Sequence, residues 1–225
     1  MPGYGTLGEH EAAVRMPPIE VPFAGVDQEV AVYRIAGSDG DVVVFEHPHF
    51  SPQGPGRIYC DDGDVRPFAT DATKFAFFSA ACANWMLARE EKPAAVHLHD
   101  WHAALYCLLR RADPRFAALR DVRTVFTIHN LAMQGIRPLD GDESSLSSWF
   151  PELDFEYDEV VDPRYADCVN PMAVAIRLAD RVNTVSPTYA TEILRPNDEA
   201  HGFHGGEGLE GDLQRVWADG RLFGI

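Results

Sequence analysis

The stretch VHLHDWHAAL, residues 96–105, sets three histidines, an aspartate and a tryptophan between an apolar run and the start of a predicted helix. Residues 94–98 are short and apolar, which is typical of a strand buried on both faces of a parallel sheet. The polar and aromatic residues follow where that strand ends. Ligands of open α/β sheets collect beyond the carboxyl ends of the strands, so this corner is a candidate functional site.

The same succession of apolar strand, polar residues and helix occurs twice more along the chain. Residues 124–128 read TVFTI and are followed by His129 and Asn130, while residues 181–185 read RVNTV and are followed by SPT. Buried strands that alternate with helices predict an α/β domain with a parallel sheet. We therefore expect the polar residues after the three strands to meet at one edge of that sheet.

Hydrophobic periodicity predicts the elements around this sheet. Apolar residues recur at three- and four-residue steps over residues 71–90, which predicts a long helix packed on a core. Residues 29–35 and 41–47 are β-rich and are joined by a Gly-Ser-Asp-Gly connector, which predicts a β-hairpin. Residues 1–27 are rich in glycine and proline, so we expect a loop with one short helix. The glycine-rich tail that holds His201 and His204 is also expected to be exposed loop.

Composition restricts the partners of the protein. The chain has 19 basic and 35 acidic residues, and its net charge of −16 argues against nonspecific binding to nucleic acid or to an anionic membrane. No apolar run reaches the ~20 residues that cross a bilayer, and the first residues lack a signal-peptide pattern. The four cysteines are widely spaced, without a CxxC pair, and are expected to be reduced thiols. We therefore expect a cytoplasmic protein without nucleic-acid or membrane partners.

The histidines of the first corner allow a metal-site interpretation. His97 and His99 share one face of a strand and His102 follows one turn later, so HxHxxH resembles a zinc motif and would make the protein a zinc hydrolase. The carboxylate of Asp100 lies one place earlier than the zinc hydrolase motif requires. A second histidine pair, in EHPHF at residues 46–50, is interrupted by a proline and followed by turn residues.

Two other interpretations of the same corner remain open. Asp100 is a suitable N-cap for the helix that follows, a structural role that does not exclude function, because a cap at the carboxyl end of a strand also faces the cleft. Alternatively, Asp100 and Trp101 join His129 and Asn130 in a sugar site. Carbohydrate hydroxyls bind carboxylate, amide and imidazole groups, and the C–H faces of a sugar pack on an aromatic surface.

Three motifs in order, HLHDWHAAL, TVFTIHNLAMQG and ADRVNTVSPTYATEI, resemble the amino-terminal domain of bacterial glycogen synthases and plant starch synthases. The similarity is strong over residues 96–135 and 179–193. It extends more loosely to MPGYG at the start and to GEGLEGDL and GRLFGI near the end. The resemblance implies a Rossmann-like parallel sheet with an added β-hairpin, which forms one of the two domains that face a cleft in the GT-B arrangement.

The resemblance also implies an activity and the residues that carry it. The family transfers glucose from ADP-glucose to the non-reducing end of an α-1,4-glucan with retention of configuration, and needs no metal or other cofactor. Asp100 and His129 match the catalytic corners of the family. Trp101, Asn130 and Tyr59 match substrate-binding positions.

The chain departs from the family pattern at both ends. The first strand of the family, with its Lys-x-Gly-Gly-Leu loop, has no counterpart, and neither does the nucleotide-binding carboxyl domain. We therefore expect residues 1–225 to form a single amino-terminal domain that is incomplete at its start and has an unpaired sheet edge. Such a chain is expected to be inactive alone. The alternative is a non-catalytic remnant that binds glucan or a protein partner.

Overall fold

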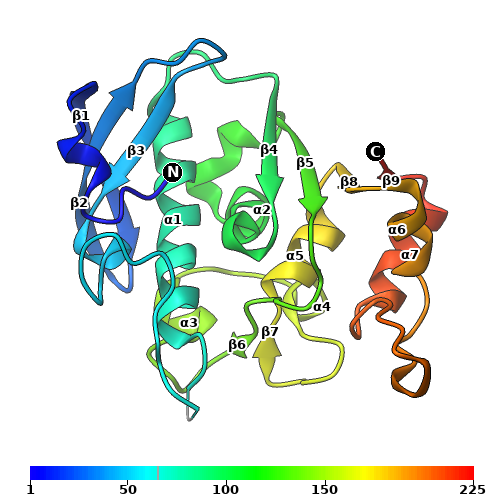
Figure 1. The fold of residues 1–225 in the computed structure, drawn as a ribbon. Coiled ribbons are helices and arrows are strands. Elements are labelled where there is room, and N and C mark those ends of the chain that lie inside the picture. Colours follow the sequence, from blue (N-terminus) through cyan, green and yellow to red (C-terminus); the bar gives the residue numbers. More distant parts are fainter. Residues whose placement is uncertain (65) are drawn as a thin grey trace.

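The computed structural model describes residues 1–64 and 66–225, and Figure 1 shows how their elements are arranged. The strands are β1 (Ala13–Phe23), β2 (Val26–Ile35), β3 (Val42–Glu46), β4 (Ala95–His99), β5 (Arg123–Ile128), β6 (Arg137–Pro138), β7 (Cys168–Val169), β8 (Arg181–Thr184) and β9 (Leu222–Gly224). The α-helices are α1 (Ala69–Ala88), α2 (Leu105–Ala112), α3 (Leu146–Trp149), α4 (Tyr157–Val160), α5 (Pro171–Leu178), α6 (Pro187–Glu192) and α7 (Glu210–Ala218).

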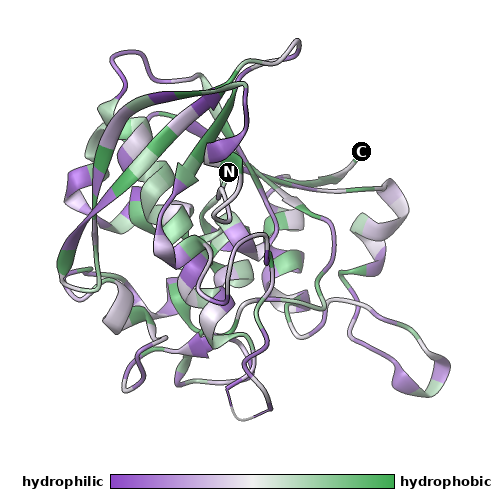
Figure 2. Ribbon diagram, turned by 60° about the vertical axis from the view of Figure 1, so that its left-hand side comes forward, coloured by the Kyte–Doolittle hydropathy of each residue, from purple (hydrophilic) through white to green (hydrophobic). Residues whose placement is uncertain are grey.

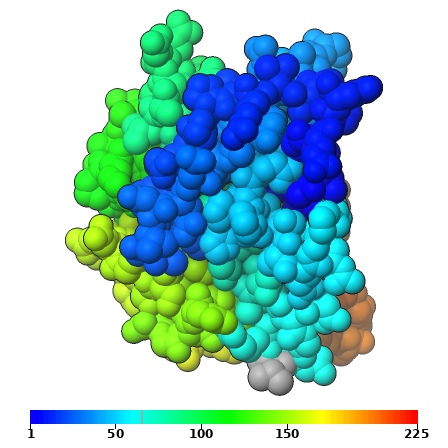
Figure 3. All heavy atoms as spheres, turned by 90° about the vertical axis from the view of Figure 1, so that its left-hand side faces the viewer, coloured from blue at the N-terminus to red at the C-terminus, as the bar shows by residue number. Residues whose placement is uncertain are grey.

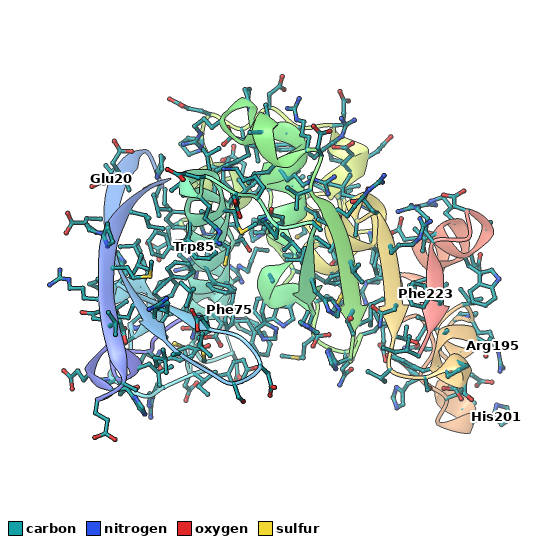
Figure 4. The ribbon with its side chains drawn as sticks, turned by 90° about the horizontal axis from the view of Figure 1, so that it is seen from above. Glu20, Phe75, Trp85, Arg195, His201 and Phe223 are labelled. Atoms are coloured by element: carbon teal, nitrogen blue, oxygen red, sulfur yellow. The ribbon has the colours of Figure 1, made fainter. Side chains whose placement is uncertain are left out.

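A parallel sheet with the order β4-β5-β8-β9 forms the centre of the domain. Helices α2 and α5 lie on one side of it, and α6 and α7 lie beside β9 (Figures 1 and 4). Leu98, Phe126 and Val182 are buried on successive strands and belong to one continuous hydrophobic core. The predicted Rossmann-like α/β fold is therefore confirmed, with three strands where the sequence predicted them.

Strand β4 forms one edge of the parallel sheet in the part of the chain that the structure describes. Ala95, His97 and His99 on this strand are exposed, whereas Leu98 is buried. An open sheet always has edge strands, so the expectation of an incomplete domain with an unpaired edge stays a prediction. Two of the three histidines of the candidate site lie on this edge strand.

The second sheet is antiparallel, with the order β1-β2-β3. Its β2–β3 hairpin was predicted, but β1 lies where the sequence predicted a loop, so that prediction is wrong. Pro17 and Pro18 fall at a register shift between Met16 and Ile19. Proline lacks the N–H that a ladder needs, and an edge strand accommodates it at such an irregularity.

The antiparallel sheet packs against α1 through its inward residues. Val21 and Phe23 from β1 and Val30 and Val32 from β2 are all buried, while their neighbours along each strand are more exposed. Figure 2 shows the corresponding alternation of hydrophilic and hydrophobic residues, and Figure 3 shows β1–β3 beside the loop that follows them. One face of the sheet therefore closes the core around α1.

The predicted helix over residues 71–90 is confirmed as α1, and a buried ion pair anchors a loop to it. Lys74 and Asp71 are in contact at 2.7 Å, with side chains 0% and 1% exposed. Asp71 also accepts the N–H of Cys60 at 3.1 Å, and the ammonium group of Lys74 donates to the carbonyl of Ile58. These bonds hold the backbone on both sides of Tyr59.

The carboxyl-terminal segment is more ordered than the sequence predicted. It contains α7 and the short strand β9, which the sequence did not predict, whereas His201 and His204 are exposed as expected. Leu222 pairs with Val182 in the parallel sheet. Asp212 on α7 is buried and accepts two hydrogen bonds from Arg177 on α5. A three-residue strand and a buried carboxylate give too weak a periodic signal to be recognised from sequence.

Every helix within residues 1–64 and 66–225 falls short of the length and apolar character that crossing a membrane requires.

We predict that Lys74→Met destabilises the fold by about 3–5 kcal/mol, because it leaves the buried carboxylate of Asp71 without its partner. Urea unfolding followed by circular dichroism measures this loss. The matched control is Arg34→Ala, which breaks an exposed pair with Asp41 (side chains 50% and 44% exposed) and is expected to cost less than about 1 kcal/mol. Equal losses in the two variants would contradict the prediction.

Candidate functional site

The carboxyl ends of β4 and β5 form the candidate site. The two strands run parallel with His99 opposite Thr127, so Asp100 and His129 leave the sheet nearly side by side. The carboxylate of Asp100 accepts the backbone N–H of His129 at 2.8 Å, and the N–H of Asp100 donates to the carbonyl of Thr127 at 3.0 Å. The predicted convergence of the first two corners is confirmed.

Asp100 adopts a backbone conformation that side chains rarely take. Its φ is 51° and its ψ is −172°, a region used almost entirely by glycine, at a cost of about 1–3 kcal/mol. It precedes a 3-10 turn, Trp101–Ala103, but its side chain makes no capping hydrogen bond there. The N-cap interpretation is therefore wrong, because the carboxylate reaches across to the loop after β5 instead.

His129 is exposed at the rim and contacts a second imidazole. Its Nε2 lies 3.0 Å from Nδ1 of His99, and the centroids of the His99 and His97 rings are 4.3 Å apart. Burial, followed by the neighbouring His97 and His129, lowers the pKa of His99 below its ordinary value. His99 is therefore neutral near pH 7, although three imidazoles are close together.

Trp101 is only 5% exposed, so it does not offer the open stacking face that a sugar-binding tryptophan was expected to provide. His102 stacks beside its indole at 4.6 Å, and Phe75 from α1 meets it edge-on at 5.1 Å. Figure 4 shows Phe75 between α1 and the parallel sheet. A Cβ added to Gly135 would come within 2.3 Å of the indole. Trp101 therefore holds the loop after β5 against β4 by packing, and its substrate-binding role remains a prediction.

The buried indole also borders a small pocket beside the corner. This pocket has a volume of about 230 Å³, and Phe68, Met133 and Arg137 line it together with Trp101. Phe68 and Met133 are 44% and 42% exposed. The indole of Trp101 thus faces a pocket on one side although it is almost completely buried.

Tyr59 reaches the same corner from the loop before α1. It is 61% exposed, and its hydroxyl lies 3.2 Å from Nε2 of His102. Asn130 is exposed on the loop after β5, where its side-chain oxygen accepts the N–H of Ala132 at 2.8 Å. The structure thus brings Tyr59, Asp100, His129 and Asn130 to one rim, and their roles in binding and catalysis remain predictions.

The metal-site interpretation of HxHxxH has no geometric support. His97 contacts Thr127, His99 contacts His129, and His102 contacts Tyr59. In the part of the chain that the structure describes, no three His, Cys, Asp or Glu side chains converge in a way that could hold a metal ion.

The histidine pair in EHPHF has a structural role. His47 and His49 stack at 5.0 Å, and Nδ1 of His47 accepts the N–H of His49 at 3.2 Å, which caps a 3-10 turn. Both rings pack on Phe77. Burial, followed by the charge of His49, lowers the pKa of His47 to about 4. Burial also lowers the pKa of His49.

Sequence reasoning did not identify two parts of the site. His99 was treated only as a possible metal ligand, although the alternation of His97 and His99 along a strand already places both on one face. The buried network formed by Thr127 and Asn183, whose side chains are hydrogen-bonded at 2.7 Å, was not predicted. The register of β4, β5 and β8 brings these residues together, and periodicity alone does not reveal register.

The fold and the site together define a Rossmann-like α/β domain with its ligand corner at the carboxyl ends of the parallel strands. The family model described as the starch synthase catalytic domain matches residues 1–215, and the chain therefore belongs to this family.

Curated relatives agree with this membership. The chain is 34% identical over 225 residues to a glycogen synthase of Anaeromyxobacter sp. (strain Fw109-5), covering 100% of this chain and 43% of that protein. It is 35% identical to glycogen synthase 1 of Synechocystis sp., covering 100% of this chain and 39% of that protein. The chain thus spans about two fifths of these relatives.

A solved structure shares the fold. The catalytic domain of starch synthase IV from Arabidopsis thaliana, bound to ADP and acarbose, superposes with a TM-score of 0.75 at 25% sequence identity. The similarity covers 96% of this chain and 41% of that one.

We predict that Asp100→Gly is more stable than Asp100→Ala by about 1 kcal/mol or more, because glycine relieves the backbone strain that alanine keeps. Both variants lose the carboxylate, so the difference between their free energies of unfolding in urea measures the backbone strain. The control pair is Asp158→Ala and Asp158→Gly in α4, where the reverse order is expected. A less stable Asp100→Gly would show that the strain is absent.

We predict that the fold loses stability as the pH falls below about 6.5, the ordinary pKa of histidine. The unfolded chain takes up protons there, whereas His47 in the folded chain does so only near its pKa of about 4. The stabilisation is therefore complete above that range and is lost on acidification.

Urea midpoints of the wild type and His47→Asn, measured between about pH 7.5 and 5, test this prediction. Asparagine keeps an acceptor for the N–H of His49 but does not titrate, so His47→Asn should lose less stability than the wild type. His201→Asn, in an exposed turn, should behave like the wild type. Identical pH dependence in wild type and His47→Asn would exclude His47 as a cause.

Proposed function

We propose that this chain supplies one half of the active-site cleft of a glycogen or starch synthase. The enzyme would transfer glucose from ADP-glucose to the non-reducing end of an α-1,4-glucan, with retention of configuration. The observation that supports this most directly is the hydrogen bond from His129 N–H to Asp100, which unites the two family motifs at one open rim. The starch synthase IV structure, bound to ADP and acarbose, supports the same ligand classes.

The reaction chemistry fits the groups present at this rim. Cleavage of the bond between glucose and diphosphate develops positive charge on the sugar ring and negative charge on the leaving diphosphate. An enzyme promotes this step by positioning donor and acceptor and by stabilising the separating charges. His129 would position the transferred glucose through a hydrogen bond between its imidazole and a sugar hydroxyl, while Asp100 keeps the His129 backbone in place.

The remaining rim residues would bind sugar hydroxyls. Tyr59 presents an exposed hydroxyl, and Asn130 is exposed on the adjacent loop. Both side chains combine donor and acceptor capacity, as alternating sugar hydroxyls require. We propose that no metal or prosthetic group takes part, and that the sugar nucleotide is a substrate rather than a cofactor.

The opposite wall of the cleft would come from a carboxyl-terminal domain. The two curated glycogen synthases are more than twice as long as this chain, which covers 43% and 39% of them. We propose that such a domain carries most contacts to the nucleotide, and that turnover requires both halves.

We predict that the chain binds maltoheptaose and that His129→Ala and Asp100→Ala each weaken binding about 3- to 10-fold, the range expected for one hydrogen bond. Isothermal titration calorimetry measures the affinity. His201→Ala, remote from the rim at the far end of the molecule (Figure 4), should bind like the wild type. Unchanged affinity in both rim variants would contradict the proposed site.

Turnover distinguishes an enzyme from a binding remnant. After addition of a carboxyl-terminal domain from a related glycogen synthase, ADP release from ADP-glucose should depend on both halves and should persist in EDTA. Glucan binding without any ADP release would indicate a non-catalytic binding module.

A further inference from the structure

Three imidazoles form a row along the rim of the parallel sheet. His97 and His99 alternate on β4 and therefore lie on one face of the sheet. His129 follows β5. The centroid of the His99 ring lies 4.3 Å from that of His97 and 5.2 Å from that of His129. His99 is thus the middle member of the row.

The inner end of the row has a defined proton position. The hydroxyl of Thr127 carries one hydrogen and donates it to Oδ1 of Asn183 at 2.7 Å. The same oxygen lies 2.6 Å from Nε2 of His97, so it must accept a hydrogen bond there. His97 therefore carries its proton on Nε2.

The outer end of the row joins two imidazoles directly. Nδ1 of His99 and Nε2 of His129 are 3.0 Å apart, so one nitrogen donates and the other accepts. His99 is neutral because burial and adjacent imidazoles lower its pKa. A neutral imidazole intrinsically favours the proton on Nε2. If Nε2–H of His129 donates to Nδ1 of His99, both rings carry their proton on Nε2 and so keep the favoured tautomer.

We propose that His99 is a positioning residue for His129: it binds Nε2–H of His129 and leaves Nδ1 unprotonated, as an acceptor for a sugar hydroxyl. The role of Nδ1 as an acceptor for sugar rests on the proposed function, whereas the position of the proton on the His129 ring does not. The carboxylate of Asp100 also accepts the backbone N–H of His129 at 2.8 Å. Two hydrogen bonds from the end of β4, one from His99 and one from Asp100, therefore set the position of the His129 ring.

Long-range ¹H–¹⁵N spectra of the histidine side chains test the proposal. In the wild type, Nδ1 of His129 should show an unprotonated shift and Nε2 a protonated one, with the signals assigned by their loss in His129→Asn. His99→Phe keeps a ring beside His97 but removes the acceptor. The His129 nitrogens should then move to averaged values as the ring exchanges between tautomers.

A conservative variant separates positioning from packing. His99→Asn places a carbonyl oxygen where Nδ1 of histidine lies, so it should restore the wild-type nitrogen shifts of His129. His201→Asn should leave them unchanged. Urea midpoints of the variants should stay close to that of the wild type, because His99 is exposed.

Glucan affinity provides the functional readout. His99→Phe should weaken maltoheptaose binding about 3- to 10-fold, and His99→Asn should recover most of it. A proton on Nδ1 of His129 in the wild type, or unchanged His129 shifts in His99→Phe, would overturn the proposal. A wild type that binds no glucan would contradict the proposed function, and the nitrogen shifts would still decide the positioning role.

Discussion

The register of β4 on β5 is the constraint on which the site depends. With His99 opposite Thr127, the residues that leave the two strands are neighbours, and Asp100 can bond the backbone of His129. A shift of one residue would turn His97 and His99 to the opposite face and separate the carboxylate of Asp100 from the backbone N–H that it accepts. Leu98 on β4 and Phe126 on β5 lie opposite each other and are both buried, which makes such a shift costly. The core of the sheet therefore fixes the geometry of its polar rim.

A second constraint brings the remaining site residue to this rim. Tyr59 lies on a long loop with little regular structure, yet the backbone on both sides of it is bonded to the buried Asp71–Lys74 pair on α1. Phe75, the next residue on α1, packs against the indole of Trp101. Helix α1 thus links the loop to the strand corner through one polar and one aromatic contact, and the stability of its ion pair controls the position of the Tyr59 hydroxyl.

Elements with a strong hydrophobic periodicity could be predicted from the sequence. Elements and side-chain contacts that depend on a tertiary neighbour could not. The three parallel strands, α1 and the β2–β3 hairpin all carry clear apolar patterns, and the motifs after the strands identified the rim and the family. The predicted burial of residues 94–98 on both faces is wrong, because β4 is an edge strand on which Ala95, His97 and His99 are exposed. Strand β1 was missed because Pro17 and Pro18 suggest a loop until a neighbouring strand shows that they lie at a register shift. Strand β9 is only three residues long. Asp100 has the residue type and position of an N-cap, and only the adjacent loop shows that its carboxylate bonds elsewhere.

The hydrogen bond to His129 explains why an aspartate, and not a glycine, is suited to this strained position. The left-handed backbone costs about 1–3 kcal/mol for a residue with a Cβ. A hydrogen bond to a charged acceptor contributes about 1.5–3 kcal/mol, so the bond to His129 roughly offsets the strain. Glycine would avoid the strain but leave the loop after β5 without its acceptor. The corner therefore adds little to folding stability, and its main consequence is the placement of His129, which is the property that the proposed sugar site requires.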